Sequence, residues 1–343
     1  MNGTPPEPGQ KEEFAREAFS LSPGAGAKGP FSLEKGEADS TASADAYARW
    51  RDAKRAGFPT RADQLVVELK DTANPTAAEQ DAIRDRVRRA GMAVYVGPAL
   101  ADVEESKDQV CALGRCFGME RLDHNPYADE DAITPLHVAA GEERLEQGRK
   151  MYIPYTSRPI NWHTDGYYNT SARRIRGMVL HCVRQAGTSG GENALFDPEM
   201  AYLLMREHDP ELVAALCRDD AMTIPGNDMD DDVTRGDVGG PVFSLNKTDQ
   251  TLYMRYTARK RNIVWAPDDM TGAAVKFMEE ILADNGPGEP YIFRHRMEPG
   301  QGLICNNVLH TRTSFEDGED DIGQRMMLRA RYYDRVSDTA SLT

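Results

Sequence analysis

Three residues of the chain have the types and spacing that could bind one metal ion. His163 and Asp165 lie two apart in INWHTDGYYN, so on an extended strand both side chains point to one face, about 7 Å apart. His310 lies at the end of another apolar run, GQGLICNNVLH. Two imidazoles and one carboxylate on one face of an iron(II) ion leave positions open for a chelating cosubstrate and for dioxygen. We therefore predict a catalytic metal site, although an HxD pair alone is more often a hydrogen-bonded pair of side chains.

A run of arginines near the end of the chain could bind a carboxylate. The segment RMMLRARYYD (325–334) alternates in character, which predicts a strand. One face would carry Arg325, Met327, Arg329 and Arg331, and the other Met326, Leu328, Ala330 and Tyr332. The planar fork of arginine binds a carboxylate through two parallel hydrogen bonds. For Arg331 we instead expect a solvated edge strand, with the charge facing water.

The elements that must position these groups change in type along the chain. Residues 1–43 are rich in Gly, Pro, Ser, Ala and charge, which predicts a flexible N-terminal arm. Residues 44–343 are predicted to form one domain with its core at about 90–335. Helices are expected at 44–58, 76–91, 103–118, 198–208 and 271–286, strands at 65–69 and 92–96, and a polar loop at 126–149.

Short strand patterns dominate from Met151 onward. They are MYIPYT, INWHTDGYY, RIRGMVLHCVRQ, PVFSL, LYMRYTA and YIFRHRM, separated by Gly, Pro and Asp. Many short strands with a few covering helices predict a mixed α/β fold of mainly antiparallel β structure. The expected architecture is a double-sheet jelly roll, whose mouth can hold a small ligand.

Composition argues against several classes of partner and site. The 41 basic and 56 acidic residues give a formal charge of −15, which disfavours nucleic acid and anionic membranes. No apolar run approaches the roughly 18 residues that span a bilayer, and the N-terminus lacks the apolar core of a signal peptide, so we expect a cytoplasmic protein. Five cysteines without a CxxC pair argue against a disulfide framework and a structural zinc site. The arm could clasp a second subunit, which leaves a homo-oligomer open.

Four ordered motifs together resemble a known family. HTDGYY, LHCVRQAGTSGGENALFD, NNVLHTRTSFEDG and QRMMLRARYYD are similar to the taurine dioxygenase superfamily, over about residues 90–335. Within it, the HTDG, LHC, GG and LxD run is most similar to the γ-butyrobetaine and trimethyllysine hydroxylase branch. The resemblance implies a double-stranded β-helix, an iron(II) ion and 2-oxoglutarate as cosubstrate. It also implies that His163, Asp165 and His310 are the metal ligands.

The same resemblance assigns cosubstrate contacts. Arg325 stands where the family binds the distal carboxylate of 2-oxoglutarate, and Arg329 stands at a second arginine near cosubstrate or substrate. Asn193 replaces the usual threonine in GGENALFD, and HTR replaces the usual HGR after His310. An asparagine amide can still donate a hydrogen bond to a carboxylate. The zinc module that the branch carries at its N-terminus is absent, because the first hundred residues contain no cysteine.

The resemblance implies a dioxygenase that uses dioxygen and 2-oxoglutarate to hydroxylate a small polar molecule, with succinate and carbon dioxide as coproducts. Candidate substrate contacts near the metal ligands are Tyr152, Tyr155, Arg158, Tyr167 and Tyr168. Aromatic faces can enclose a quaternary ammonium, each worth about 0.5–2 kcal/mol, which would suit a betaine. The alternatives are that these rings pack in the core, or that Arg158 and Arg329 grip a sulfonate, as in a taurine-type enzyme.

Two further classes compete with a hydroxylase. A cupin-like metal-binding sensor would keep the fold without turnover, but a pure binder needs no ligand set with open positions. A halogenase-like oxygenase lacks the carboxylate ligand, which Asp165 supplies here. His181 in MVLHCVRQ is expected to be a hydrogen-bonded core histidine rather than a ligand, and the acidic run 226–237 lacks the spacing of a calcium loop.

Overall fold

The computed structural model describes residues 29–33, 40–124, 131–138, 153–187, 189–226, 236–318 and 324–340. Its helices are α2 (Ser40–Gly57), α3 (Ala77–Ala90), α4 (Val103–Cys116), α6 (Pro198–His208), α7 (Pro210–Leu216) and α8 (Asp269–Leu282). Its strands are β1 (Val66–Glu68), β2 (Met92–Val96), β3 (Thr134–Leu136), β4 (Ile160–His163), β5 (Gly177–Arg184), β6 (Ser189–Gly190), β7 (Asn193–Phe196), β8 (Met222–Ile224), β9 (Val238–Gly240), β10 (Phe243–Leu245), β11 (Leu252–Met254), β12 (Val264–Trp265), β13 (Phe293–His295), β14 (Gln301–Cys305), β15 (Leu309–Arg312), β16 (Phe315–Glu316) and β17 (Met326–Tyr332).

The larger sheet has six strands in the order β1-β2-β14-β5-β17-β3, antiparallel except between β1 and β2. Strand β5 at its centre is buried on both faces. Its residues Met178 and Leu180 point into one apolar cluster, and Val179 and Val183 into another. A strand covered on both faces needs no polar alternation, which explains the apolar run GMVLHCV.

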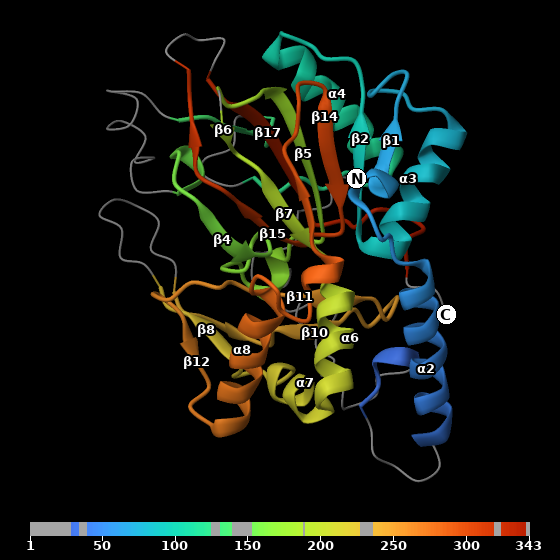
Figure 1. The fold of residues 1–343 in the computed structure, drawn as a ribbon, viewed down its shortest axis with the longest axis vertical. Coiled ribbons are helices and arrows are strands. Elements are labelled where there is room, and N and C mark those ends of the chain that lie inside the picture. Colours follow the sequence, from blue (N-terminus) through green and yellow to red (C-terminus); the bar gives the residue numbers. More distant parts are fainter. Residues whose placement is uncertain are drawn as a thin grey trace, which may run out of the picture.

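A smaller four-stranded sheet, β13-β7-β15-β4, is wholly antiparallel. Its residues Leu195, Phe196 and Leu309 share one apolar cluster with Leu180 and Met327 of the larger sheet. The two sheets therefore enclose a common core (Figure 1). The smaller sheet carries two of the candidate metal ligands, His163 on β4 and His310 on β15.

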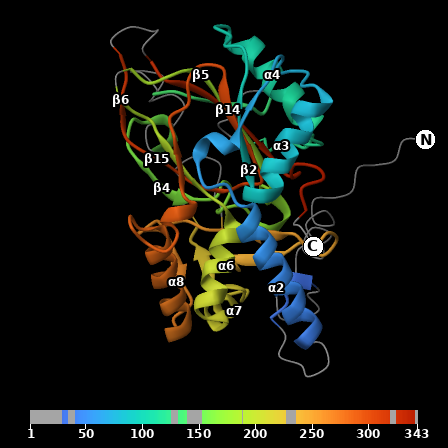
Figure 2. The same cartoon turned by 45° about the vertical axis from the view of Figure 1, so that its right-hand side comes forward.

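The helices form two groups (Figure 2). Helices α3 and α4 cover the outer face of the larger sheet, where Val87 and Leu113 pack with Tyr95. Helix α3 begins at a capping box formed by Thr76 and Glu79 and ends at Gly91 with φ 72°, as the sequence predicts. Helices α6, α7 and α8 pack on one another at the other end of the molecule, and α2 lies alongside α6.

The segment before α2 corrects the predicted arm. Phe31, which lies within residues 1–43, is 1 % exposed and packs edge-on against Trp50 and Tyr202. Arg206 donates hydrogen bonds to the backbone oxygens of Pro30 and Ser32. Residues 29–33 are therefore part of the core, and residues 1–28 lie outside the described residues.

Other local predictions are also corrected. Within MYIPYT, Ile153–Tyr155 forms a 3-10 helix rather than a strand, and within the expected loop 126–149, Thr134–Leu136 is strand β3. Helix α7 was not expected, and α8 ends at Leu282 rather than near residue 286. None of the helices in the described residues combines the length and the apolarity needed to cross a bilayer.

Candidate metal centre

Strand pairing brings the two candidate histidine ligands together. His310 on β15 is the register partner of His163 on β4, so both imidazoles project from neighbouring strands. Their ring centroids are 4.2 Å apart. Directly opposed residues of antiparallel strands have side chains about 5 Å apart, which is the spacing that lets two imidazoles reach one ion.

Asp165 reaches the same point from a turn, not from the strand that the HxD spacing predicted. Strand β4 ends at His163, and Asp165 lies in the turn that follows. One nitrogen of each imidazole and one carboxylate oxygen of Asp165 lie within 4.8 Å of one another. The three residues that the sequence singled out therefore converge, although the backbone of Asp165 is not extended β structure.

Hydrogen bonds fix the orientation of both imidazoles. Nδ1 of His163 lies 2.9 Å from the backbone oxygen of Asn161, and Nδ1 of His310 lies 2.9 Å from that of Val308. A carbonyl oxygen can only accept, so each Nδ1 carries the proton and each Nε2 presents a lone pair. Burial lowers the pKa of both rings, that of His163 to about 3. Both are neutral at physiological pH, as metal ligation requires.

Only one of the two carboxylate oxygens of Asp165 has a hydrogen-bond partner among the described residues. Asp165 is 3 % exposed, and its Oδ1 accepts a hydrogen bond from Arg329 at 3.2 Å. Burial raises its pKa, but the positive charges of Arg329 and Arg331 outweigh burial, so the pKa falls below its usual range. Oδ2 is buried and has no hydrogen-bond partner among the described residues. A buried carboxylate with one oxygen that has no hydrogen-bond partner, in a residue that lies close to two neutral imidazoles, fits a divalent metal ion.

Asn307 fixes the turn that carries Asp165. Its Oδ1 accepts from the backbone N–H of Asp165 at 2.8 Å, and its Nδ2 donates to the backbone oxygens of Asp165 and Ile175 at 3.0 and 2.7 Å. Asn307 is buried and has φ 51°, a left-handed conformation that asparagine tolerates. It lies three residues before His310, so one side chain ties the two ligand segments together. The role of Asn307 was not predicted from the sequence, although an NN pair ending three residues before His310 is typical of a turn.

Arg325 lines a small pocket, with Gly191, Asn193 and Arg296 also in its wall. Its side chain is buried, and no acidic group pairs with it in the parts of the chain that the structure describes. Burial lowers its pKa to about 10. Asn193 donates Nδ2 to the backbone oxygen of Thr311 at 2.8 Å and leaves its Oδ1 unpartnered. The Thr311 oxygen uses one of the two amide hydrogens of Asn193, which leaves one N–H donor for a carboxylate.

The arginines of β17 have different surroundings. The predicted alternation is confirmed: Leu328, Ala330 and Tyr332 join the cluster beneath α3 and α4, and Met327 joins the cluster between the sheets. The prediction for Arg331 is wrong. Its strand lies between β5 and β3, not at an edge, and Arg331 is buried in an ion pair with Asp123. Its other terminal nitrogen donates to Tyr168 Oη at 2.8 Å.

The candidate substrate residues do not form one cluster. Tyr155 is buried and Arg158 is exposed, and Tyr152 lies outside the described residues. Tyr167 packs edge-on against His163, with ring centroids 6.2 Å apart, and edge-on against Tyr168. Among them, Tyr167 therefore lies against a candidate ligand. His181 is buried, 3.0 Å from Tyr95 Oη through Nδ1, as expected for a core histidine.

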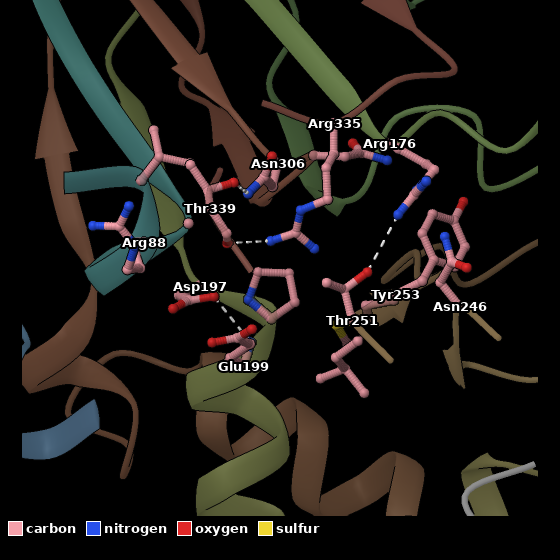
Figure 3. Close-up of a pocket in the computed structure, with 16 residues that line it drawn as sticks. Arg88, Arg176, Asp197, Glu199, Asn246, Thr251, Tyr253, Asn306, Arg335 and Thr339 are labelled. Atoms are coloured by element: carbon pink, nitrogen blue, oxygen red, sulfur yellow. Dashed lines mark hydrogen bonds between the residues drawn. The ribbon is translucent and has the colours of Figure 1, made fainter. Parts of the chain in front are cut away.

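The pocket in Figure 3 is a different place from the metal centre. It is a cleft of about 560 Å³ among α3, the start of α6, the β10–β11 turn and the C-terminal segment, and none of the three candidate ligands lines it. Its wall is held by polar contacts, such as Arg176 to Thr251 at 3.2 Å and Asn306 to Thr339 at 3.0 Å. The reacting groups predicted from the sequence therefore lie elsewhere.

Comparison with known proteins agrees with this geometry. Residues 54–331 match the model of the taurine catabolism dioxygenase TauD, TfdA family. The chain belongs to this family. The protein is accordingly a non-haem iron, 2-oxoglutarate-dependent oxygenase, with iron(II) as its metal and 2-oxoglutarate as cosubstrate. None of the curated proteins matches the chain.

Solved structures show that the fold is the double-stranded β-helix of this family. The non-heme iron oxygenase OrfP with Fe, succinate and (3S)-hydroxy-L-Arg has TM-score 0.54 at 14% identity, over 88% of this chain and 97% of that one. An asparagine oxygenase with Fe(II), 2S,3S-3-hydroxyasparagine and succinate has TM-score 0.50 at 14% identity, over 78% and 93%. A taurine dioxygenase from Burkholderia xenovorans has TM-score 0.51 at 13% identity, over 80% and 89%. The γ-butyrobetaine branch is not confirmed by these comparisons.

Proposed function

We propose that this oxygenase hydroxylates a small polar molecule, with iron(II) held by His163, Asp165 and His310 and the distal carboxylate of 2-oxoglutarate held by Arg325. The reaction consumes one C–H bond, dioxygen and 2-oxoglutarate, and yields an alcohol, succinate and carbon dioxide. Bound iron supplies the activation of dioxygen, driven by oxidation of the cosubstrate. The chain supplies the neutral imidazoles, the carboxylate and the arginine that would bind the cosubstrate.

The observation that carries this proposal is that a carboxylate oxygen at the metal centre and the guanidinium of Arg325 are both buried, the first without a hydrogen-bond partner and the second without an acidic partner among the described residues. Asp165 Oδ2 has no partner at the metal centre, and the guanidinium of Arg325 has no acidic partner among the described residues. Leu195 is the register partner of His310, and Asn193, two residues along β7, lines the Arg325 pocket. Two strand residues span about 7 Å, a distance that a five-carbon dicarboxylate can bridge. Asn193 is assigned to the wall of that pocket.

The charges near the centre bear on the substrate. A betaine would need aromatic faces free for its quaternary ammonium, but Arg259 already lies 5.6 Å from the Tyr167 ring centroid, and Arg331 holds the Tyr168 hydroxyl. Arg329 lies against Asp165. Of these three cations, Arg259 alone has no acidic partner among the described residues. Its charge favours an acidic group on the substrate, which supports the taurine-type alternative and, for a betaine, recognition through its carboxylate. A cytoplasmic location and a homo-oligomer remain predictions from the sequence.

The test is iron-dependent formation of succinate from 2-oxoglutarate by purified protein, with small amines, betaines, amino acids and sulfonates added singly. We expect succinate formation that requires iron and rises with the true substrate. A cupin-like sensor would bind iron and form no succinate under any of these conditions, which would contradict the proposal. Mass spectrometry of the stimulated reaction should show a product 16 Da heavier than the substrate.

A further inference from the structure

A basic turn stands out in an acidic chain. Arg259, Lys260 and Arg261 are three consecutive exposed cations in a protein of formal charge −15. No ion pair with an acidic residue involves any of them in the described parts of the chain, whereas the exposed Arg61 and the half-buried Arg218 each pair with a neighbouring aspartate. Such a surface pair contributes only about 0–1 kcal/mol to stability, but it cancels much of the positive charge that the surface presents. Their positive charge is therefore left uncompensated by the described chain.

This turn adjoins the strand that carries a metal ligand. Thr257 forms a β-bridge with His163, and the N–H of Ala258 donates to the backbone oxygen of Trp162 at 2.8 Å. The chain therefore runs beside the end of β4 until the turn at Asn262, which has φ 57°. The basic residues lie directly after the segment that is fixed to the metal centre.

One side chain of the turn extends back to the centre. The guanidinium of Arg259 lies 5.6 Å from the ring centroid of Tyr167, and that ring packs edge-on against His163. Stacking on an aromatic face orients a guanidinium and leaves its N–H edge free to bind an anion. A path of two contacts thus connects an exposed cation to a candidate iron ligand.

We propose that the turn Arg259–Arg261, with Arg259 oriented by Tyr167, is a binding site at the rim of the iron centre for an acidic group of the substrate. The ligand class is a small acid whose carboxylate or sulfonate lies away from the carbon that is oxidised. Positive charge near the metal centre also raises the local concentration of such an acid at low ionic strength. This inference rests on the proposed hydroxylase function and specifies its substrate class.

The test compares isosteric acid and amide pairs as probes. Succinate formation is measured with L-glutamate against L-glutamine and L-aspartate against L-asparagine, in native protein and in the triple variant Arg259→Gln, Lys260→Gln, Arg261→Gln. We expect the native protein to prefer the acid of at least one pair by about tenfold or more in kcat/KM, and the triple variant to reduce that ratio to about one. The loss should lie in KM and should shrink with added salt.

A matched control removes the same charge elsewhere. The exposed residues Lys70, Arg115 and Lys247 are replaced by glutamine together, and the acid-to-amide ratio should then persist. No preference for either acid in native protein, or a preference that survives the Arg259–Arg261 replacement, would overturn the inference. Absence of iron-dependent succinate with every probe and without substrate would instead contradict the hydroxylase function. Thermal melting of both triple variants checks that they remain folded.

Discussion

The two ends of β17 carry buried arginines that differ in their surroundings: Arg331 pairs with a buried aspartate, and Arg325 pairs with no described acidic residue. Arg325, just before the strand, is 4 % exposed, and Arg331, near its end, is 2 % exposed. Burial lowers the pKa of Arg325 to about 10. Burial acts on Arg331 in the same direction, but the charges of Asp165 and Asp123 and the hydroxyl of Tyr168 raise its pKa overall.

The difference separates structural from functional charge in this molecule. A buried cation is costly unless an anion compensates it. At Arg331 the chain supplies that anion, and Asp123 also binds Arg173 and Tyr333, so the group joins β17 to neighbouring segments. At Arg325 none of the described acidic residues forms an ion pair with the guanidinium, and Asp317, the carboxylate whose charge acts to raise its pKa, accepts a hydrogen bond from the Arg325 backbone N–H. The Arg325 guanidinium is therefore the one of the two that can bind the carboxylate of a ligand.

Replacement of Asp165 should have the largest effect. One oxygen of this carboxylate, Oδ1, is paired with Arg329, and the other, Oδ2, has no partner among the described residues. Asp165→Ala removes the anionic ligand. Loss of groups that merely support a ligand costs 10–100-fold, so we expect iron affinity to fall by more than about 100-fold and turnover to be lost. Iron content after dialysis and succinate yield measure both.

The control for this prediction is His181→Ala, which removes a buried histidine that contacts Tyr95 and not the metal centre. It should retain iron even if stability falls. Full iron stoichiometry in Asp165→Ala would refute the ligand assignment.

Arg331→Met should produce the next largest change, and its main effect should be a loss of stability. It leaves Asp123 buried without its main counter-charge, and breaking a buried pair on one side typically costs about 3–5 kcal/mol. Urea unfolding should report a loss of that size in the free energy of unfolding. Combining it with Asp123→Asn should recover part of the loss, because the second change removes the unpaired charge. Equal stability of Arg331→Met and native protein would mean that the ion pair is not structural.

Sequence patterns predicted the parts of this site that depend on local order. The alternation of RMMLRARYYD is a local property, and the structure bears it out. His163 and His310 both lie on strands, but β4 ends at His163, and the run GQGLICNNVLH divides into β14 and the start of β15, so His310 is not at the end of its strand. The burial of Arg331 and its ion pair could not be predicted from local order, because its partner Asp123 lies 208 residues away in sequence. The turn at Asp165 was missed for the same reason: the asparagine that holds it is 142 residues distant. Long-range polar contacts leave no periodic signal.

Arg325→Lys tests the uncompensated end of β17. Lysine keeps the charge but cannot form the two parallel bonds of a guanidinium fork, and a charge-assisted bond contributes about 1.5–3 kcal/mol. The KM for 2-oxoglutarate should rise by at least about tenfold. Iron affinity should be preserved, and unfolding free energy should change little because no described ion pair is lost.

Arg329→Lys provides the comparison for Arg325, because Arg329 bonds to Asp165 rather than lining the Arg325 pocket. It should act mainly on iron affinity or on the substrate. If Arg329→Lys alone changes saturation by 2-oxoglutarate, the two arginine assignments are reversed. If neither variant changes it, the cosubstrate site is misassigned.

The smallest predicted effect concerns Asn307, which is compared with the adjacent Asn306 because the two side chains bind different segments of the chain. Asn307 binds the backbone of Asp165 through two hydrogen bonds, whereas Asn306 donates to Thr339 and accepts from the N–H of Val336 in the C-terminal segment. Asn307→Gly removes the side chain, and glycine adopts the left-handed backbone conformation of this position without strain. Loss of a group that orients a metal ligand typically lowers metal affinity 10–100-fold. Asn307 orients the backbone of Asp165 rather than its carboxylate, so we expect metal affinity to fall by about tenfold, at the lower end of that range.

Asn306→Ala is the matched control for that variant, because it removes a side chain with a similar number of hydrogen bonds from the same turn. Both changes should cost about 1–3 kcal/mol of unfolding free energy, so stability cannot distinguish them. Affinity for Co(II), followed by its visible absorption, can: it should fall in Asn307→Gly and persist in Asn306→Ala. Equal affinities would mean that the Asp165 turn keeps its geometry without Asn307. A loss in both would mean that metal binding depends on the stability of the whole β14–β15 turn, and that no single side chain positions the carboxylate.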